Sequence, residues 1–176
     1  MDINQTPTEQ PRIYVACLAA YNNGYLHGEW IEAQDAWSMW EATRNMLAKS
    51  PIPDAEEWAI HDYEGFSGVR IEEYTSFERV AELATFIADH GDLAAELLDH
   101  YNGDLEEARS ALDDRHLGQY QSLADYVQDV TEETNAIPQS LRYYIDWQAM
   151  ARDCELNGEL FTIQTAHDAV HVFAGC

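Results

Sequence analysis

Residues 12–33, RIYVACLAAYNNGYLHGEWIEA, contain two apolar runs separated by a turn-forming segment. Val, Ile, Tyr and Trp favour strands, and an Asn-Gly pair such as Asn23-Gly24 is typical of the turn in a β-hairpin. The stretch therefore predicts two antiparallel strands, Arg12–Ala19 and Gly28–Ala33, with the Cys17 side chain in the core.

A helix and a third strand complete this first module. Asp35 is a favourable N-cap for a helix that continues to about Ala48, and Pro51 follows where the helix ends. Residues 57–63, EWAIHDY, have the composition of a third strand. These elements predict a small α+β module.

The apolar periodicity changes from strand-like to helical in the middle of the chain. Thr75 and Glu78 have the spacing of a capping box, and apolar residues then recur every three or four positions until His90-Gly91. A second helix is expected to end at Asn102-Gly103, and a third begins after Asp104. The middle segment is predicted to be helical throughout.

The last part of the chain is predicted to contain two helices and a hairpin. Ser122 is the N-cap of the first helix, and Pro138 begins the second. Leu160–Thr165 and Ala169–Ala174 alternate like strands and are joined by a short turn at His167-Asp168.

The predicted fold class is α+β, an elongated chain of three small modules. The N-terminal module is a three-stranded sheet plus a helix, the middle is acidic and all-helical, and the C-terminal module combines helices with a β-hairpin. The expected boundaries are a flexible tail at 1–11, the N-terminal module at 12–66, the acidic helical module at 67–115 and the C-terminal module at 116–176.

Charge is the strongest functional signal in the composition. The chain has 33 Asp and Glu against 9 Lys and Arg, a formal net charge of −24. Residues 54–133 alone carry 22 acidic and 4 basic residues, a net −18, whereas residues 12–53 carry four acidic and three basic, a net −1. Phosphate backbones and anionic membranes would repel such a surface, so nucleic acid and membranes are excluded as direct partners.

Within that acidic stretch, carboxylates recur at helical spacing on faces opposite the apolar ones. Like charges three or four residues apart destabilise a helix by about 0.2–0.5 kcal/mol per pair, so the pattern indicates a role other than stability. We expect these carboxylates to imitate the phosphates of a DNA duplex. They are Asp62, Glu64, Glu72, Glu73, Glu78, Glu82, Asp89, Asp92, Glu96, Asp99, Asp104, Glu106, Glu107, Asp113, Asp114, Asp125, Asp129, Glu132 and Glu133.

Charge density tests whether such imitation is feasible. A duplex presents roughly one negative charge per 1.7 Å of axis, whereas a helix with a carboxylate at every fourth position presents roughly one per 6 Å. About three or four acidic faces side by side would match the duplex, and the chain offers that many. A two-fold dimer would carry the charge of roughly 80 Å of duplex.

Two other interpretations remain open from the residues alone. An acidic, halophile-type structural or interaction domain would also be depleted in lysine, although its charge should be spread over every module. A metal-dependent enzyme is the second, because His167 and His171 are four residues apart. The favoured interpretation is not an enzyme and has no catalytic residues, no cofactor and no metal.

Five blocks of sequence resemble those of the ArdA-type antirestriction proteins, in the order of that family from about Arg12 to Phe173. They are IYVACLAAYNNG (13–24), HGEWI (27–31), AIHDYE (59–64), YYIDWQAMARDCEL (143–156) and FTI (161–163). The family's antirestriction motif falls around Leu123–Pro138, where Asn135 replaces its usual glycine.

The resemblance implies an elongated homodimer that mimics bent B-form DNA and blocks the DNA-binding groove of type I restriction-modification enzymes. The resemblance also implies that the protein spares incoming plasmid or transposon DNA. A cytoplasmic location fits the residues, because the polar N-terminus has no signal-like apolar core and the three cysteines are odd in number. The possible dimer interface comprises Tyr126, Ile137, Tyr143, Tyr144 and Trp147, since exposed aromatic patches often mark interfaces.

Overall fold

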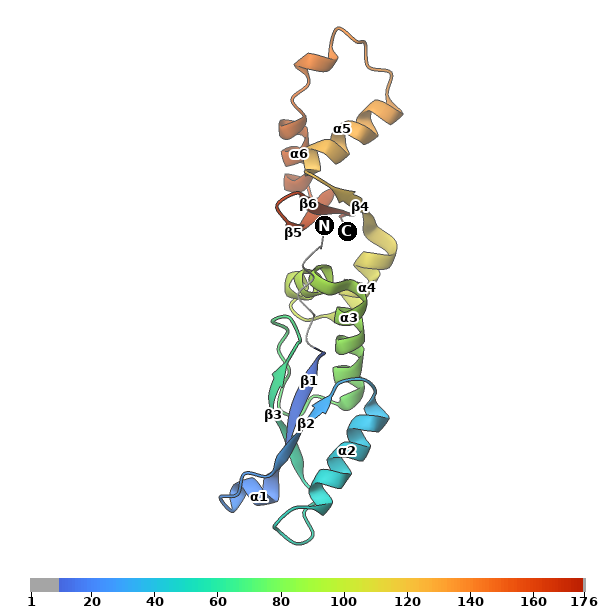
Figure 1. Ribbon diagram of the computed structural model, residues 1–176. Helices are drawn as coiled ribbons and strands as arrows, with labels where there is room; N and C mark the ends of the chain where they lie inside the picture. The colour runs from blue at the N-terminus through green and yellow to red at the C-terminus, as the bar shows by residue number, and fades with distance from the viewer. Residues whose placement is uncertain (1–9, 176) are drawn as a thin grey trace, which may run out of the picture. The chain divides into compact units, whose positions relative to one another are not determined.

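The computed structural model describes residues 10–175 and confirms the α+β class. The chain divides into two compact units, residues 1–95 and 96–176, which are described separately (Figure 1). Within the described residues, the strands form two three-stranded antiparallel sheets, one in each unit. Most of the predicted tail, residues 1–9, lies outside the described residues.

The first unit is built on a sheet with the strand order β2-β1-β3. These strands are β1 (Arg12–Cys17), β2 (Gly28–Glu32) and β3 (Trp58–Glu64). Ile13 on the central strand lies opposite Ile31 on β2 and opposite Tyr63 on β3, and its side chain is fully buried. The predicted hairpin and third strand are therefore confirmed.

The connection between β1 and β2 differs from the predicted tight turn. The first strand ends at Cys17, two residues earlier than expected, and a short helix α1 (Leu18–Asn22) follows. The Cys17 Sγ atom accepts a hydrogen bond from the Ala20 N–H at 3.5 Å, so it caps this helix while lying in the core. Gly24 adopts φ 82° after the helix and turns the chain towards β2.

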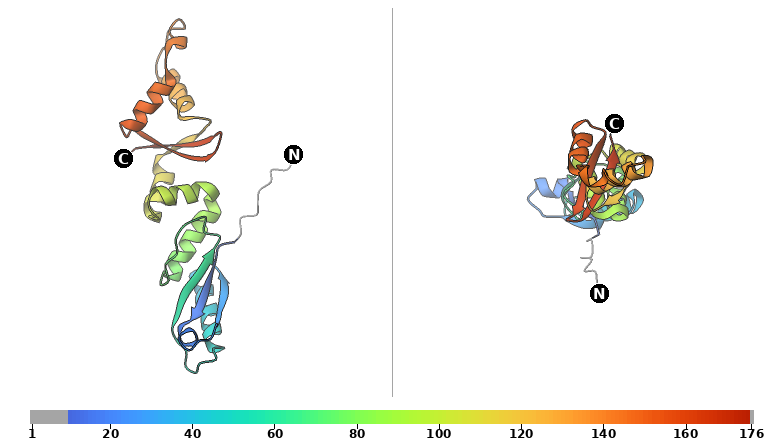
Figure 2. Two further views of the ribbon diagram at one scale, coloured as in Figure 1. Left: turned by 90° about the vertical axis from the view of Figure 1, so that its left-hand side faces the viewer. Right: turned by 90° about the horizontal axis from the view of Figure 1, so that it is seen from above.

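Helix α2 (Ala36–Ala48) begins at the cap that the sequence predicts. The Asp35 side chain accepts a hydrogen bond from the Ser38 N–H at 2.9 Å, and this bond, then that of the Ser38 hydroxyl, lowers the pKa of Asp35. The inward face carries the buried Met39 and Met46. Figure 2 shows this helix, in cyan, beside the strands of the first unit.

Helix α3 (Phe77–His100) begins one residue later than the predicted capping box would place it. The Ser76 Oγ accepts from the Arg79 N–H at 3.2 Å, whereas the Thr75 hydroxyl accepts from the Glu72 N–H of the preceding turn. Gly91 has non-helical angles, φ 55° and ψ −132°, inside the helix. The predicted interruption is therefore present at Gly91, although helix is assigned on both sides of it.

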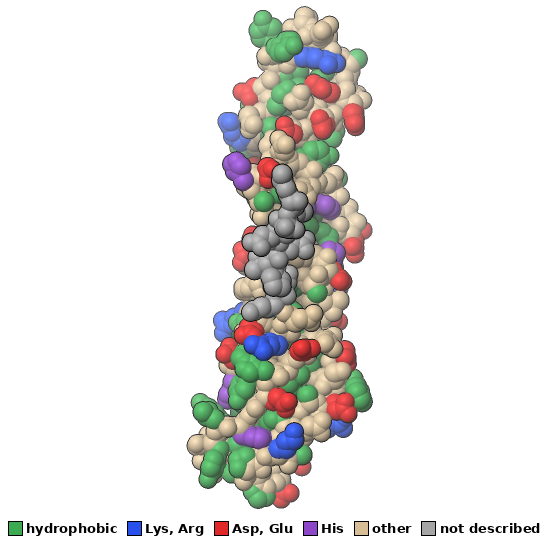
Figure 3. All heavy atoms as spheres, viewed as in Figure 1, with side chains coloured by type: hydrophobic (Ala, Val, Ile, Leu, Met, Phe, Trp, Pro, Cys, Tyr) green, Lys and Arg blue, Asp and Glu red, His purple; other side chains and the backbone are tan. Residues whose placement is uncertain are grey.

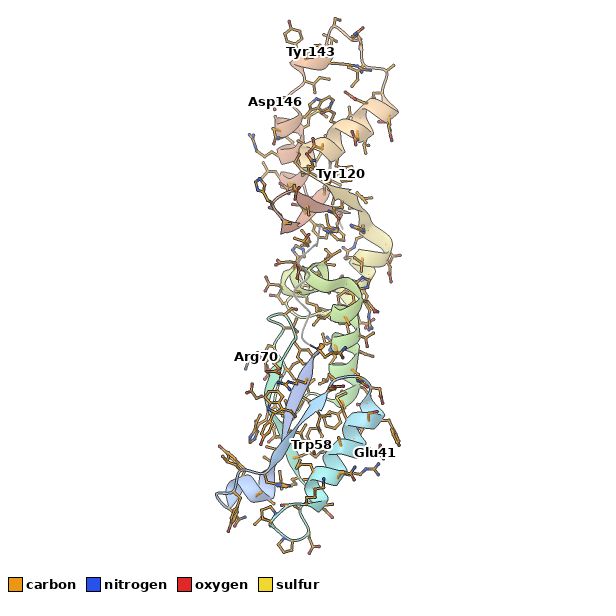
Figure 4. The ribbon with its side chains drawn as sticks, viewed as in Figure 1. Glu41, Trp58, Arg70, Tyr120, Tyr143 and Asp146 are labelled. Carbon is orange, nitrogen blue, oxygen red and sulfur yellow. The ribbon has the colours of Figure 1, made fainter. Side chains whose placement is uncertain are left out.

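Three aromatic rings pack together where α2, β3 and α3 meet. Trp58 stacks on Phe77 with centroids 4.4 Å apart, and Trp40 meets Trp58 edge-on at 5.4 Å. Figure 4 labels Trp58 in this cluster. This packing attaches the first turn of α3 to the sheet of the first unit.

The middle of the chain is less uniformly helical than predicted. Residues 67–76 are turns and irregular backbone, and helix α4 (Leu105–Ser110) is followed by a π-helical turn, Ala111–Arg115. Asp104 caps α4 as expected, because its side chain accepts from the N–H groups of Glu106 and Glu107.

The second unit contains a sheet with the order β4-β6-β5. The predicted hairpin is present as β5 (Leu160–Ala166) and β6 (Ala169–Ala174). The sequence does not predict β4 (His116–Tyr120), which pairs with β6 through His116 opposite Phe173. The C-terminal module therefore has a three-stranded sheet in place of a hairpin alone.

Two helices pack on each other beside this sheet. Helix α5 (Leu123–Thr134) has the predicted Ser122 cap, with the Asp125 N–H donating to Ser122 Oγ at 3.2 Å. The helix predicted from Pro138 is wrong. A 3-10 turn lies at Arg142–Tyr144, and helix α6 (Trp147–Leu156) begins only after Asp146, which accepts from the Ala149 N–H.

Candidate partner-binding surface

The nineteen candidate carboxylates are almost all on the surface. All are exposed except Glu64 and Glu132, which are half-buried. The first unit holds Asp62 and Glu64 on β3, Glu72 and Glu73 after it, and Glu78, Glu82, Asp89 and Asp92 on α3. The second unit holds Glu96 and Asp99 on α3, Asp104, Glu106 and Glu107 at α4, Asp113 and Asp114 in the π-helical turn, and Asp125, Asp129, Glu132 and Glu133 on α5.

Helix α3 separates its apolar and acidic residues onto opposite faces. Val80 and Ile87 are fully buried. Glu78, Glu82 and Asp89 are exposed and recur at helical spacing. These three carboxylates therefore form a row along the solvent face of this helix, as the periodicity predicts.

Helix α5 repeats the same division in the second unit. Ala124 and Val127 are buried and pack with Ala151 of α6, while Asp125, Asp129 and other acidic residues face solvent. Asp125 also accepts a hydrogen bond from the Ser122 hydroxyl at 2.6 Å, so this carboxylate has a local role at the helix start. The outward acidic row begins with the residue that helps to cap the helix.

Arginine partners neutralise some of the candidate carboxylates. Glu64, Glu72, Glu82, Glu106 and Glu107 each form an ion pair with an arginine, and the Arg70–Glu72 pair has an N–O distance of 2.9 Å. An exposed ion pair such as Arg70–Glu72 contributes only about 0–1 kcal/mol to stability. Figure 3 shows acidic side chains over both units, with few basic ones between them.

The five predicted dimer residues lie in different environments. Tyr143 and Tyr144 are 92% and 86% exposed, and Figure 4 shows Tyr143 directed away from the ribbon. Tyr126 and Trp147 instead pack against the core between α5 and α6, and burial raises the pKa of Tyr126. Ile137 is half-buried. Among the five, Tyr143 and Tyr144 are the most exposed.

Two histidines that the sequence does not predict as a pair meet between β4 and β6. His116 Nε2 lies 3.0 Å from His171 Nδ1, and both rings are partly buried. Desolvation lowers the pKa of His116 and of His171, and the charge of His116 further lowers that of His171. The i,i+4 pair His167 and His171 is not brought together in this way, because His167 is in the exposed hairpin turn.

Metal binding, the alternative interpretation, requires several His, Cys, Asp or Glu side chains that converge on one point. Within residues 10–175, no group of three or more His, Cys, Asp or Glu side chains has an arrangement that could hold a metal ion. The pairing of His116 with His171 was not detectable from sequence, because it depends on the strand β4 that the sequence pattern does not predict.

The fold and the exposed acidic rows define an acidic α+β protein. A family model described as antirestriction protein (ArdA) matches residues 13–169, and the chain belongs to this family. Its function is therefore antirestriction, which implies interaction with restriction-modification enzymes. A comparison with curated proteins finds no match.

Among residues 10–175, no helix combines the length and the apolar composition that crossing a bilayer requires.

Proposed function

We propose that the protein mimics the charge and shape of double-stranded B-form DNA and competitively blocks the DNA-binding groove of type I restriction-modification enzymes. It acts in the cytoplasm as a homodimer. The observation that carries the proposal is the exposure of the acidic residues on helix faces whose opposite sides are buried. Such faces present charge at fixed intervals to a partner.

Helix geometry sets the charge spacing that each face can provide. With a rise of about 1.5 Å per residue, carboxylates four residues apart are separated by about 6 Å along the axis. This spacing is sparser than in a duplex, so several faces must act together. Helix α3, the segment from Asp104 to Asp114 and helix α5 each supply one.

The interaction is expected to be electrostatic in origin. Arg and Lys side chains that line a DNA channel would pair with carboxylates in place of phosphates. Imitation of the backbone carries no base sequence, so inhibition should be independent of the enzyme's recognition site. Added salt should weaken the complex, because exposed charges are screened over about 10 Å at 0.1 M ionic strength.

A competition assay with matched charge variants tests the proposal. The chain would be added to a type I enzyme holding a labelled duplex, and the concentration that displaces half of the duplex measured. Replacing Asp129→Asn, Glu132→Gln and Glu133→Gln should weaken displacement about tenfold, at about 0.5 kcal/mol per charge removed. The control, Glu29→Gln, Glu32→Gln and Glu41→Gln, removes equal charge from the nearly neutral region and should displace like the unmodified chain.

If the unmodified chain does not displace the duplex at about 50 mM salt, the proposal is contradicted, because electrostatic competition is strongest at low ionic strength. Equal loss in both triple variants would show that only total charge matters. Sedimentation equilibrium of the unmodified chain tests the homodimer, with Tyr143→Ser and Tyr144→Ser expected to shift the protein towards monomer.

A further inference from the structure

An exposed apolar patch lies at the end of the first unit that contains α1. Tyr21 and Tyr25 are 56% and 54% exposed, and Leu26 is 92% exposed. Figure 3 shows hydrophobic side chains gathered where Figure 1 places α1. We call these three residues the Tyr21 patch.

Backbone hydrogen bonds hold the patch in a defined conformation. The Tyr25 N–H donates to the Ala20 carbonyl at 3.0 Å, and the Gly24 N–H donates to the Tyr21 carbonyl at 3.0 Å. The Cys17 N–H donates to the His27 carbonyl at 2.9 Å and closes the segment. The patch is thus displayed on an ordered turn, which lowers the entropy lost when a partner binds it.

The patch is continuous with the acidic surface of the same unit. The Tyr21 ring meets the His61 ring edge-on, with centroids 4.9 Å apart. His61 Nε2 lies 3.8 Å from Glu73 Oε1, and Asp62 follows His61 on β3. A protein that binds the candidate carboxylates Asp62 and Glu73 would therefore also lie close to Tyr21.

Charge distinguishes the patch from its acidic neighbours and limits what can cover it. Residues 12–53 have a net charge of −1, so they cannot imitate a row of phosphates. The residues proposed for the homodimer contact, Tyr143 and Tyr144, belong to the second unit, so that contact does not use the patch. A protein whose basic channel binds the carboxylates of the first unit is drawn against this unit by opposite charge.

We infer that the Tyr21 patch is a second contact on the restriction-modification enzyme, docking on a neutral, apolar surface that borders its DNA channel. This inference rests on the proposed function. The carboxylates supply salt-dependent attraction, and the patch supplies contact area that salt does not screen. Tyrosine suits this task because it buries a large, rigid surface and is enriched at binding hot spots.

The salt dependence of affinity separates the two contributions. The full-length variant Tyr21→Ser, Tyr25→Ser and Leu26→Ser would be compared with the unmodified chain for binding to the type I enzyme between about 0.05 and 0.3 M salt. We expect the dissociation constant to rise about tenfold at every salt concentration. The slope of log Kd against log salt should stay the same, whereas the Asp129, Glu132 and Glu133 variant should have a smaller slope.

A single exposed leucine elsewhere provides the control. Leu156 is 77% exposed on α6, and Leu156→Ser should leave binding unchanged. Circular dichroism and the urea midpoint would show that each variant folds. If the triple variant does not fold, the single variant Leu26→Ser replaces it, because this side chain is almost wholly exposed. Its affinity for the enzyme is then expected to fall by about threefold or more.

Unchanged affinity of a folded patch variant at every salt concentration would overturn the inference. So would a change of its oligomeric state in sedimentation, which would assign the patch to a second copy. If the proposed function itself is wrong, the result is different, because the unmodified chain then does not displace the duplex at all.

Discussion

At the scale of single residues, the His116–His171 pair is the clearest site of pH sensitivity. The two ring nitrogens are 3.0 Å apart, and one ring must donate its proton while the other accepts. Phe173 lies against His116 with centroids 4.9 Å apart, while the adjacent Arg115 is paired with Glu107. The pair therefore has an apolar neighbour, and desolvation lowers the pKa of both histidines.

The protein should lose stability as the pH falls through the histidine range. The folded pKa values of His116 and His171 lie below the ordinary 6.5, so below about pH 6.5 the unfolded chain binds protons that the folded chain does not. The stability that the neutral histidine pair contributes is therefore present above about pH 6.5 and is lost as the pH falls below it.

Urea midpoints at pH 7.5 and 5.5, approximately, measure this loss. His171→Gln should show a smaller difference between the two midpoints than the unmodified chain. His167→Gln, which changes the exposed turn histidine and leaves the pair intact, should show the unmodified difference. An unaltered pH dependence in His171→Gln would exclude the pair as its source.

At the scale of elements, sequence predicts those helix starts whose signals are local. Asp35 and Ser122 are short polar residues whose side chains accept from the N–H three positions later, and both caps are confirmed. The π-helical turn and strand β4 depend on contacts distant in sequence. His116–Tyr120 includes Gly118 and becomes a strand only because β6 pairs with it.

Two incorrect predictions have a common physical cause. Leu18 and Ala19 are compatible with strand or helix. They are helical here because the Cys17 side chain caps the segment and the turn at Gly24 ends it. Pro138 is suited to a first helical turn, but the residue before it has no side-chain group that can cap a helix. Asp146 has such a group, and the helix begins after it. Where two local signals compete, the helix begins at the residue whose side chain completes the hydrogen bonds.

Removal of the Ser122 cap should destabilise the second unit. Ser122→Ala deletes the acceptor of the Asp125 N–H and should lower the free energy of unfolding by about 1 kcal/mol. Urea denaturation of the full chain provides the measurement. Ser110→Ala, which removes an exposed hydroxyl near the end of α4, should change stability by less than about 0.5 kcal/mol.

The interruption in α3 depends on glycine. Gly91→Ala would place a side chain on a residue with φ 55° and ψ −132°, and we expect a loss of about 1–3 kcal/mol. Thermal unfolding tests this, with Thr85→Ala on the exposed face of the same helix as control. A Gly91→Ala variant as stable as the unmodified chain would mean that α3 can straighten without cost.

At the scale of the whole molecule, the solvent-facing position of the carboxylates followed from periodicity, because an apolar stripe leaves the opposite helix face to water. The arginine partners of Glu64 and Glu107 could not be predicted, since Arg12 and Arg115 reach them through the fold. The continuity between Tyr21 and His61 was also beyond sequence, because it joins α1 to β3.

The chain should remain folded when salt is removed. Its self-repulsion at a net charge of −24 weakens the compact state and is screened by ions, so the urea midpoint should rise modestly with salt. Circular dichroism at about 10 mM and 1 M salt checks this. Unfolding at the lower concentration would favour the halophile-type interpretation.

The near-complete exposure of the acidic rows bears on how such a protein evolves. A carboxylate that touches little of its own chain can be exchanged between Asp and Glu, or moved by one helical turn, with little effect on folding. Selection then acts on the pattern of charge and hardly on residue identity. Lineages performing the same task can diverge quickly on the outside while their buried positions change slowly.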